Sequence, residues 1–468
     1  MGFLDRFFKI SEVGSTVRRE IYGGVVTFLA VSYILAVNPA ILSTTGMDRG
    51  GVLCATALAG FFGTMMMAVL ANYPLVLAPA MGLNAFFAFT VVRGMGYSWQ
   101  IALFAVVLEG IIFFLLSLSS IREKIINAIP MPLKYAMAAG IGLFISLLAF
   151  KSAHIIKAHP DTLLTIQNFF GESFHTAGIS ALLALAGILI TAFLLDRNVI
   201  GSILLGILAT WLLGMICEAA GIYHVRPAEG FHSLFPHFSW ESFTEPFKGF
   251  AGLFGSAFDV DQWSCLNSDK KGLALLRSME FAVICFSFLF ADFFDTVGTI
   301  NGAVINTPLM KEDGSIPRLR GALFADSVAT FAGGIFGTST TTTLAESATG
   351  ISAGARTGLA AMVAALLFLI SLVAAPIFMA IPGFATAPAL VIVGFLMLRS
   401  VKQIDLEDVS GAMPAYLAMA GMVFTYSISD GLGLGIISWT VLNCGKKGRV
   451  NWLLWLISII FLAKYIFL

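Results

Sequence analysis

The sequence has few charged residues: Asp, Glu, Lys and Arg make up only 12% of its 468 residues, whereas a soluble domain carries about 25%. Hydrophobic residues make up 58%. A soluble chain of this length has to present polar residues to water, so this composition indicates that lipid surrounds most of the chain. The formal net charge is zero, which excludes the basic field expected of a nucleic-acid-binding protein.

Clustered metal ligands and nucleophiles are also missing. The five cysteines are scattered without a CxxC pair, and such a set is typical of packing residues rather than of disulfides or a metal site. All six histidines lie between residues 154 and 237, outside the apolar segments, and no Ser/His pair lies within such a segment. These absences argue against a membrane enzyme, and we expect neither a metal site nor a cofactor.

Long apolar stretches recur along the chain. A membrane-spanning helix needs about 20 mostly apolar residues. Seven stretches precede a more polar region at 220–275, seven follow it, and one more closes the sequence. They lie near 20–42, 52–72, 79–95, 99–120, 132–150, 178–195 and 199–219, then near 278–300, 319–335, 344–354, 358–378, 385–400, 413–428 and 430–443, and finally at 450–468. We expect the last stretch to be either an interfacial helix or an extra span.

The two halves of the sequence resemble each other in order. Residues 51–63 match residues 321–333 at a constant offset of 270, through shared Gly, Leu, Ala and Phe positions, and 186–196 match 420–430 at an offset of 234. Seven spans per half would place the halves in opposite orientations, which is the inverted-repeat plan of many secondary transporters. With the N-terminus inside, most Lys and Arg residues of the short loops lie inside too, as the positive-inside rule requires.

Two segments are interrupted at corresponding places in the halves. The third contains Pro74 and Pro79 before Asn84, and the tenth contains a run of threonines at 340–343 before Glu346. Neither composition suits a full-length helix. Irregular backbone at membrane depth is tolerated around a polar cavity or where protein buries it, and paired broken segments indicate a transporter's binding site. We expect a short helix after each break, with its N-terminal N–H groups towards the cavity.

Acidic residues lie within the apolar segments, but no Lys or Arg lies in the middle of one. Asp292 and Asp295 are three residues apart and therefore share one face of a helix. A carboxylate at membrane depth normally faces a cavity and has a function, and without a cationic partner it binds a proton more readily. Carboxylates also bind Na⁺. The six residues are Glu109, Glu280, Asp292, Asp295, Asp326 and Glu346, and we interpret Glu109 and Glu280 as helix-end or packing residues.

Three motifs together resemble the AzgA-like purine permeases, a branch of the nucleobase–cation symporter-2 family. They are AMGLNAFFAF (80–89), FADFFDTVGT (290–299) and TTTTLAESATGISAGARTG (340–358), and the similarity extends from about residue 14 to 445. The resemblance implies fourteen segments in two inverted repeats, with short strands in segments three and ten. It also implies a core domain that moves against a gate domain while a purine and a proton cross together.

Motif matching assigns roles to individual residues. Asn84 takes the polar contact of segment three, Glu346 the acid that pairs with the base, and Asp292 and Asp295 the two acidic positions of segment eight. We expect the substrate to contact Asn84, Phe293, Asp295, Glu346 and Ser347, and the proton to use Asp292, with Asp326 as a second candidate.

We therefore predict an all-α, multi-pass protein of the cell membrane with fourteen segments arranged as 7+7 inverted repeats. The predicted function is import of a purine nucleobase (adenine, guanine or hypoxanthine) by symport with H⁺, or else with Na⁺; an anion transporter or channel on the same fold is the alternative. A homodimer is a further expectation. The predicted regions are a cytoplasmic N-terminus (1–19), core helices that run into the gate (20–150), gate helices (132–219), an external loop (220–275), second-repeat core helices (276–378), gate helices (385–443) and a C-terminal helix (450–468).

Overall fold

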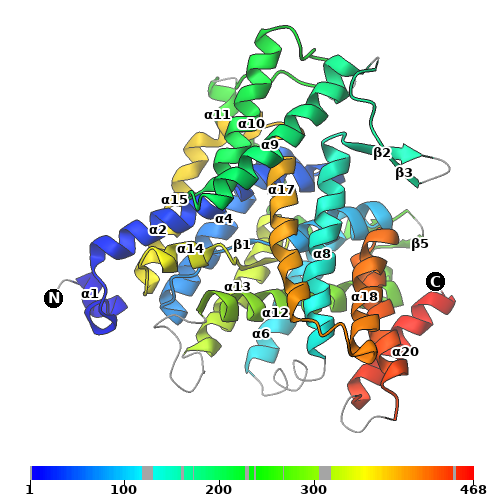
Figure 1. Ribbon diagram of the computed structural model, residues 1–468. Helices are drawn as coiled ribbons and strands as arrows, with labels where there is room; N and C mark the ends of the chain where they lie inside the picture. The colour runs from blue at the N-terminus through cyan, green and yellow to red at the C-terminus, as the bar shows by residue number, and fades with distance from the viewer. Residues whose placement is uncertain are drawn as a thin grey trace.

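The computed structural model describes residues 3–118, 130–159, 163–171, 173–226, 231–236, 239–266, 268–304, 318–445 and 450–467. Helices dominate them (Figure 1). The helices and strands of the first half are α1 (Phe3–Phe8), α2 (Val17–Val31), α3 (Ile34–Leu42), α4 (Arg49–Met66), β1 (Leu77–Pro79), α5 (Met81–Ala85), α6 (Trp99–Leu118), α8 (Met131–Ser152), β2 (Ile156–His159), β3 (Leu163–Ile166), α9 (Ile179–Asp196) and α10 (Ser202–Ala219). Two π-helices, η3 (Met67–Ala71) and η4 (Phe86–Gly94), extend α4 and α5.

The second half follows the same plan. Its elements are α11 (Trp240–Leu253), β4 (Ser264–Cys265), β5 (Ser268–Lys271), α12 (Met279–Val304), α13 (Leu319–Phe336), β6 (Thr341–Thr343), α14 (Ser347–Ser352), α15 (Gly358–Ser371), α16 (Ala375–Ala380), α17 (Gly383–Leu398), α18 (Val409–Phe424), α19 (Ile428–Leu442) and α20 (Trp452–Phe467). Among the described residues, eight helical stretches are long and apolar enough to cross a membrane, and shorter apolar helices accompany them.

Side-chain caps start several of these helices. The Asp48 carboxylate accepts a hydrogen bond from the Gly51 N–H at the start of α4, and the Thr357 hydroxyl accepts one from Leu359 at the start of α15. Ser427 caps α19 in the same way. Each cap satisfies a backbone donor that the first helical turn leaves free, so these helices begin at defined residues.

The inverted repeat is visible in helix lengths. Helices α4 and α13 both have 18 residues, and their first residues, Arg49 and Leu319, are 270 positions apart. Each is followed by a short strand and then a short helix: β1 and α5 in the first half, β6 and α14 in the second. The predicted fold class is therefore confirmed, including the strands in segments three and ten.

The second sequence match between the halves is only partly correct. Residues 186–196 all lie in one helix, α9, whereas their counterparts are divided between two helices. Ala420 and Gly421 lie in α18, Thr425 is its C-terminal cap, and Asp430 already belongs to α19. The chain turns at Tyr426, which has a φ of 56°. Asp196 and Asp430 are therefore not structural equivalents.

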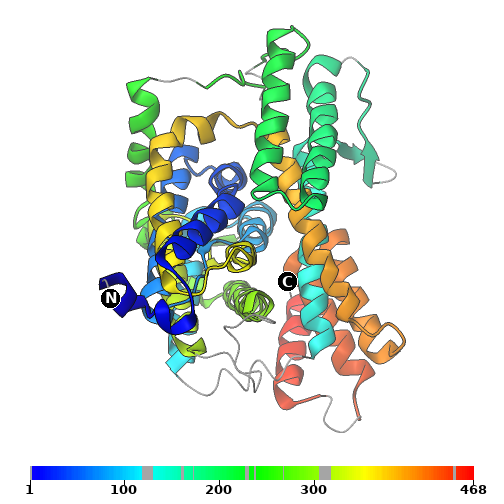
Figure 2. The same cartoon turned by 60° about the vertical axis from the view of Figure 1, so that its left-hand side comes forward.

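The helices form two groups, which Figure 2 shows side by side. In one group, α6 packs on α12 and α13, α2 packs on α14 and α15, and α4 packs on α13 and α15. In the other, α8 packs on α17 and α18, α17 also contacts α9 and α10, and α18 packs on α19. The first group contains β1 and β6 and is called the core group below; the second is called the gate group.

The region 220–275, which we predicted as a loop, contains ordered structure. Helix α11 lies along α4, and the close approach requires glycine: a Cβ on Gly51 would lie 2.6 Å from the carbonyl carbon of Gly249. The β4–β5 hairpin then pairs through Cys265 with Tyr97, just before α6. The polar region thus covers one end of the core group.

The C-terminal helix α20 runs antiparallel to α19 along most of its length. The Tyr465 hydroxyl donates to the Asp430 carbonyl at 3.0 Å, and the Thr440 and Ser458 hydroxyls lie 2.7 Å apart near the other end. The structure thus places α20 alongside a helix of the gate group, and the choice between an interfacial helix and an extra span stays a prediction.

Candidate functional site

The centre of the core group is the antiparallel pairing of β1 with β6, which is called the strand crossing below. Leu77 pairs with Thr343, Ala78 with Thr342 and Pro79 with Thr341, and all six residues are buried. Pro79 cannot donate to the ladder, and Thr has high strand propensity, so both sequences suit a two-stranded pairing better than a helix. Further hydrogen bonds on each side extend the pairing, from Ala80 N to Thr340 O at 3.1 Å and from Leu344 N to Val76 O at 2.9 Å.

Two helices of the core group hold the strands in place. The Thr64 hydroxyl of α4 exchanges two 3.0 Å hydrogen bonds with the backbone of Leu77 in β1. The Thr330 hydroxyl of α13 donates to the Thr341 carbonyl of β6, also at 3.0 Å. Backbone groups that a helix would satisfy internally are therefore satisfied by side chains of neighbouring helices, as buried irregular backbone requires.

Asn84 lies in α5, just after β1, and is completely buried. Its Oδ1 accepts a hydrogen bond from the Ser339 hydroxyl, which precedes β6. Its Nδ2 has no hydrogen-bond acceptor among the described residues. A buried amide with an unused donor is costly unless a ligand or water completes it, so Asn84 offers a donor for a polar solute.

Glu346 immediately precedes α14 and is half-buried. Its Oε1 accepts a 2.7 Å hydrogen bond from the hydroxyl of Tyr33, which is itself 1% exposed. Sequence analysis missed Tyr33, which lies where the first segment breaks between α2 and α3. The tyrosine fixes one carboxylate oxygen, which positions the other for a donor pair on a ligand.

Ser347, predicted as a substrate contact, lies in the first turn of α14 and is buried. Its hydroxyl accepts a 2.9 Å hydrogen bond from the backbone N–H of Val76, which precedes β1. This contact links the two broken segments, so the structure shows a positioning contact for Ser347.

Asp326 of α13 receives hydrogen bonds from α12 and from the second broken segment. The Thr296 hydroxyl donates to it at 2.7 Å, the Thr342 hydroxyl at 3.1 Å, and the Thr343 N–H and hydroxyl at 3.0 and 3.2 Å. Asp326 therefore attaches β6 to α13.

Asp292 of α12 is fully buried, and the hydroxyls of Thr296 and Thr330 approach its carboxylate at 3.4 Å, which is long for a hydrogen bond. The carboxyl group of Glu109 from α6 lies within hydrogen-bonding reach of it. Glu109, which we interpreted as a packing residue, is also fully buried and accepts a 2.7 Å hydrogen bond from the Thr340 hydroxyl. Asp292 and Asp326, the two residues predicted to carry the proton, are thus both buried in the core group next to the second broken segment.

Asp295 and Phe293 belong to α12. Their side chains lie outside the described part of the structure, so their predicted contacts with the substrate stay predictions. Phe86 and Phe87 of the first motif are buried and pack against Phe288 of α12, with ring centroids 4.7 and 6.4 Å apart, respectively. These two rings form part of the core.

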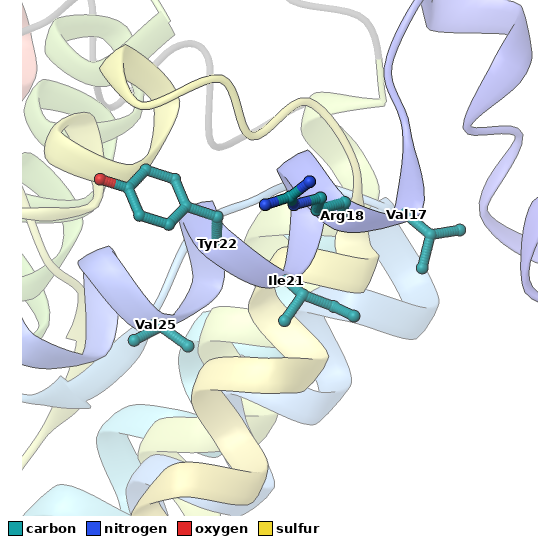
Figure 3. Close-up of a pocket in the computed structure, with 5 residues that line it drawn as sticks. All are labelled: Val17, Arg18, Ile21, Tyr22 and Val25. Carbon is teal, nitrogen blue, oxygen red and sulfur yellow. The ribbon is translucent and has the colours of Figure 1, made fainter.

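A hollow of about 540 Å³ lies elsewhere, on the outward side of α2 (Figure 3). Its lining residues all come from this helix: Val17, Arg18, Ile21, Tyr22 and Val25. Ile21 and Tyr22 are among the exposed large side chains. The five lining residues recur at helical spacing along one broad face of α2, and in a membrane such an exposed face contacts lipid rather than a transported solute.

A crossing of two broken segments within a multi-pass helical fold, with amide and carboxylate groups around it, defines a membrane transporter. Solved structures share the fold: the transmembrane domain of the cyanobacterial bicarbonate transporter BicA matches with a TM-score of 0.61 and 15% identity, over 89% of this chain and 97% of that one. At this identity the similarity supports the architecture alone.

Residues 18–434 match the model of the Permease family. The chain is 41% identical to putative permease MJ0326 of Methanocaldococcus jannaschii, over 100% of this chain and 99% of the relative. It is 36% identical to the adenine permease AdeP of Escherichia coli (100% and 97% covered) and 39% identical to the guanine/hypoxanthine permease PbuG of Bacillus subtilis (99% and 99%). The chain therefore belongs to this permease family, and the resemblance to the AzgA-like branch of the nucleobase–cation symporters is confirmed.

Proposed function

We propose that this protein imports a purine nucleobase together with a proton, and that its core group moves against its gate group during transport. The observation that carries the proposal is the juxtaposition at the strand crossing. Asn84 with an unused donor and Glu346 with one oxygen fixed by Tyr33 follow the two paired strands. The names of the relatives, which are adenine and guanine/hypoxanthine permeases, support the same substrate class.

The chemistry of a purine edge fits these groups. A neutral purine presents adjacent N–H donors and ring-nitrogen or carbonyl acceptors. A carboxylate accepts two neighbouring N–H groups, and an amide N–H₂ donates to a ring acceptor. The predicted contacts of Asp295 and Phe293 belong to the same proposal.

Movement between the groups is supported by close packing at their boundary. A Cβ on Gly82 of α5 would lie 2.6 Å from Ile141 Cγ2 of α8, so glycine allows the core to pass close to the gate. Larger side chains would hold the two surfaces apart or lock them together.

The second candidate, an anion transporter or channel, is favoured by the fold shared with BicA. The groups at the crossing argue against it. Glu346 lies at the site and Glu109, Asp292 and Asp326 lie behind it, so an anion would meet negative charge or the cost of neutralising it. A site for an anion would instead offer a cation or uncharged donors.

Uptake into proteoliposomes tests the proposal. Purified protein is reconstituted, and entry of radiolabelled adenine, guanine and hypoxanthine is measured with a pH gradient, with a Na⁺ gradient and with neither. We expect accumulation of at least one purine with the pH gradient. Accumulation with the Na⁺ gradient alone would mean that Na⁺ rather than H⁺ is the coupling ion. Uptake of bicarbonate or chloride without purine uptake would favour the anion transporter. The same sample, cross-linked, reports whether the expected homodimer forms.

A further inference from the structure

We propose that Glu109 and Asp292 share one proton and together form the proton-carrying site of this transporter. Sequence analysis assigned the proton to Asp292, with Asp326 behind it, and gave Glu109 a packing role. The inference rests on the proposed symport for its physiological meaning, but the shared proton can be tested by itself.

The first observation is the approach of two acids. The side chains of Glu109 and Asp292 are both 0% exposed, and their carboxyl groups are within hydrogen-bonding reach. Two ionised carboxylates have no donor between them, so a contact of this kind is stable only when one carboxyl group carries a proton and donates it to the other. The pair then titrates as a unit rather than as two separate residues.

The surroundings of Glu109 favour this arrangement. Its Oε2 accepts from Thr340, whereas its Oε1 has no donor among the described residues. The other titratable groups close to it are the carboxyl group of Asp326 in α13 and the thiol of Cys285 in α12. No Lys or Arg within the described parts of the chain forms an ion pair with Glu109. A second negative charge in this position would be both desolvated and repelled.

Asp326 differs from the pair in its hydrogen bonds. It accepts four hydrogen bonds from three threonines, between 2.7 and 3.2 Å. These donors stabilise its ionised form, and its negative charge in turn favours the protonated state of the neighbouring pair. One acid of the cluster thus stays charged while the other two hold the proton.

The pair is also connected to the candidate substrate site. Glu109 binds the hydroxyl of Thr340, and the preceding residue, Ser339, binds Asn84. The carbonyl of Thr340 accepts from Ala80 N, just before α5. Loss of the proton leaves two carboxylates in contact. Their repulsion acts on Thr340, and through the hydrogen bonds of Ser339 and Thr340 it reaches Asn84 and the start of α5. The hydrogen bond between Glu109 and Thr340 therefore couples the protonation of the pair to the position of the candidate substrate-binding residues.

Glu109→Gln is the central test, because glutamine has the shape of a protonated glutamic acid and still accepts from Thr340. We expect it to bind purine and to exchange labelled for unlabelled purine across the membrane. It should lose accumulation driven by a pH gradient, and its purine affinity should no longer change with pH. Asp292→Asn should give the same phenotype, and the double variant should be no worse coupled than either single variant.

The matched control is Glu280→Gln. Glu280 is a half-buried acid at the start of α12 that accepts a 2.9 Å hydrogen bond from the Tyr97 hydroxyl, away from the pair. This variant should couple as the wild type does. If Glu109→Gln accumulates purine like Glu280→Gln, with an unchanged pH dependence of binding, the shared proton is not the coupled proton and the inference is wrong.

Infrared spectroscopy separates this inference from the proposed function. At neutral pH the wild type should show the carbonyl band of a protonated carboxyl group, and the band should be missing from both Glu109→Gln and Asp292→Asn but present in Glu280→Gln. If the wild type shows the band but transports no purine, the proposed symport is wrong and the inference of a shared proton still holds. A band that persists in both variants of the pair would refute the shared proton whatever is transported.

Discussion

Replacing Glu346 by glutamine should weaken purine binding while leaving the protein folded. Tyr33 occupies Oε1 of the carboxylate at 2.7 Å, so a base pairs chiefly with the remaining oxygen. Glutamine would present an N–H₂ group in place of one oxygen and set a donor against a donor. Loss of a charged partner costs about 2–5 kcal/mol. Because Glu346 is only half-buried, we expect the lower half of that range, about 30-fold to several hundred-fold weaker binding.

Equilibrium binding of labelled purine to purified protein in detergent measures this effect. Two further variants serve as comparisons for the effect of Glu346→Gln. Tyr33→Phe removes one hydrogen bond to the carboxylate but keeps its charge, so it should cost about 1 kcal/mol. Glu12→Gln removes an acid that forms an exposed pair with Lys9 at 3.3 Å and should change nothing. The reasoning is refuted if Glu346→Gln binds purine as tightly as Glu12→Gln does.

Three further predictions follow from the fold. Gly82→Ala should lower the initial rate of uptake, because its Cβ meets Ile141 at the boundary of core and gate groups; Gly252→Ala, whose Cβ meets nothing within 4 Å, is the control, and equal rates would contradict the prediction. Asp326→Ala should lower the free energy of unfolding by about 3 kcal/mol, read as a lower thermal midpoint in detergent, because it strands donors of β6. On a cysteine-free background, Glu312→Cys should be labelled from the cytoplasm and His232→Cys from outside, and labelling from the same side would refute the inverted orientation.

The broken segments were predictable because their composition conflicts with their surroundings. Pro79 and the threonines at 341–343 interrupt apolar stretches, and neither suits a buried helix. The structure places both in paired strands, at the positions that the sequence indicated. Asn84 and Glu346 were recognisable for the same reason, since each is a polar residue that follows such a break.

The partners of those residues were not predictable. The hydrogen bond between Tyr33 and Glu346 joins positions 313 residues apart, and that between Glu109 and Thr340 joins positions 231 apart. A single sequence shows that an acid is embedded, but not which donors reach it. Asp326, for example, accepts three hydrogen bonds from β6 and one from Thr296 of α12, and none of them could be read from the sequence. The role of a buried acid depends on that count of donors.

At one equivalent position the two repeats carry different residues, a neutral one in the first repeat and an acidic one in the second. At matching places 270 residues apart, α4 carries Thr56 and α13 carries Asp326. Thr56 accepts one neutral hydrogen bond, from Asn38, whereas Asp326 accepts charge-assisted bonds from β6. The first repeat contributes an apolar strand and the second a strand of threonines. In our proposal, a proton that enters or leaves beside Asp326 changes the electrostatic forces on β6 more than those on β1. Because Glu346 lies three residues after the end of β6, the carboxylate that we assign to the substrate is close in the chain to the strand that, in our proposal, responds to the proton.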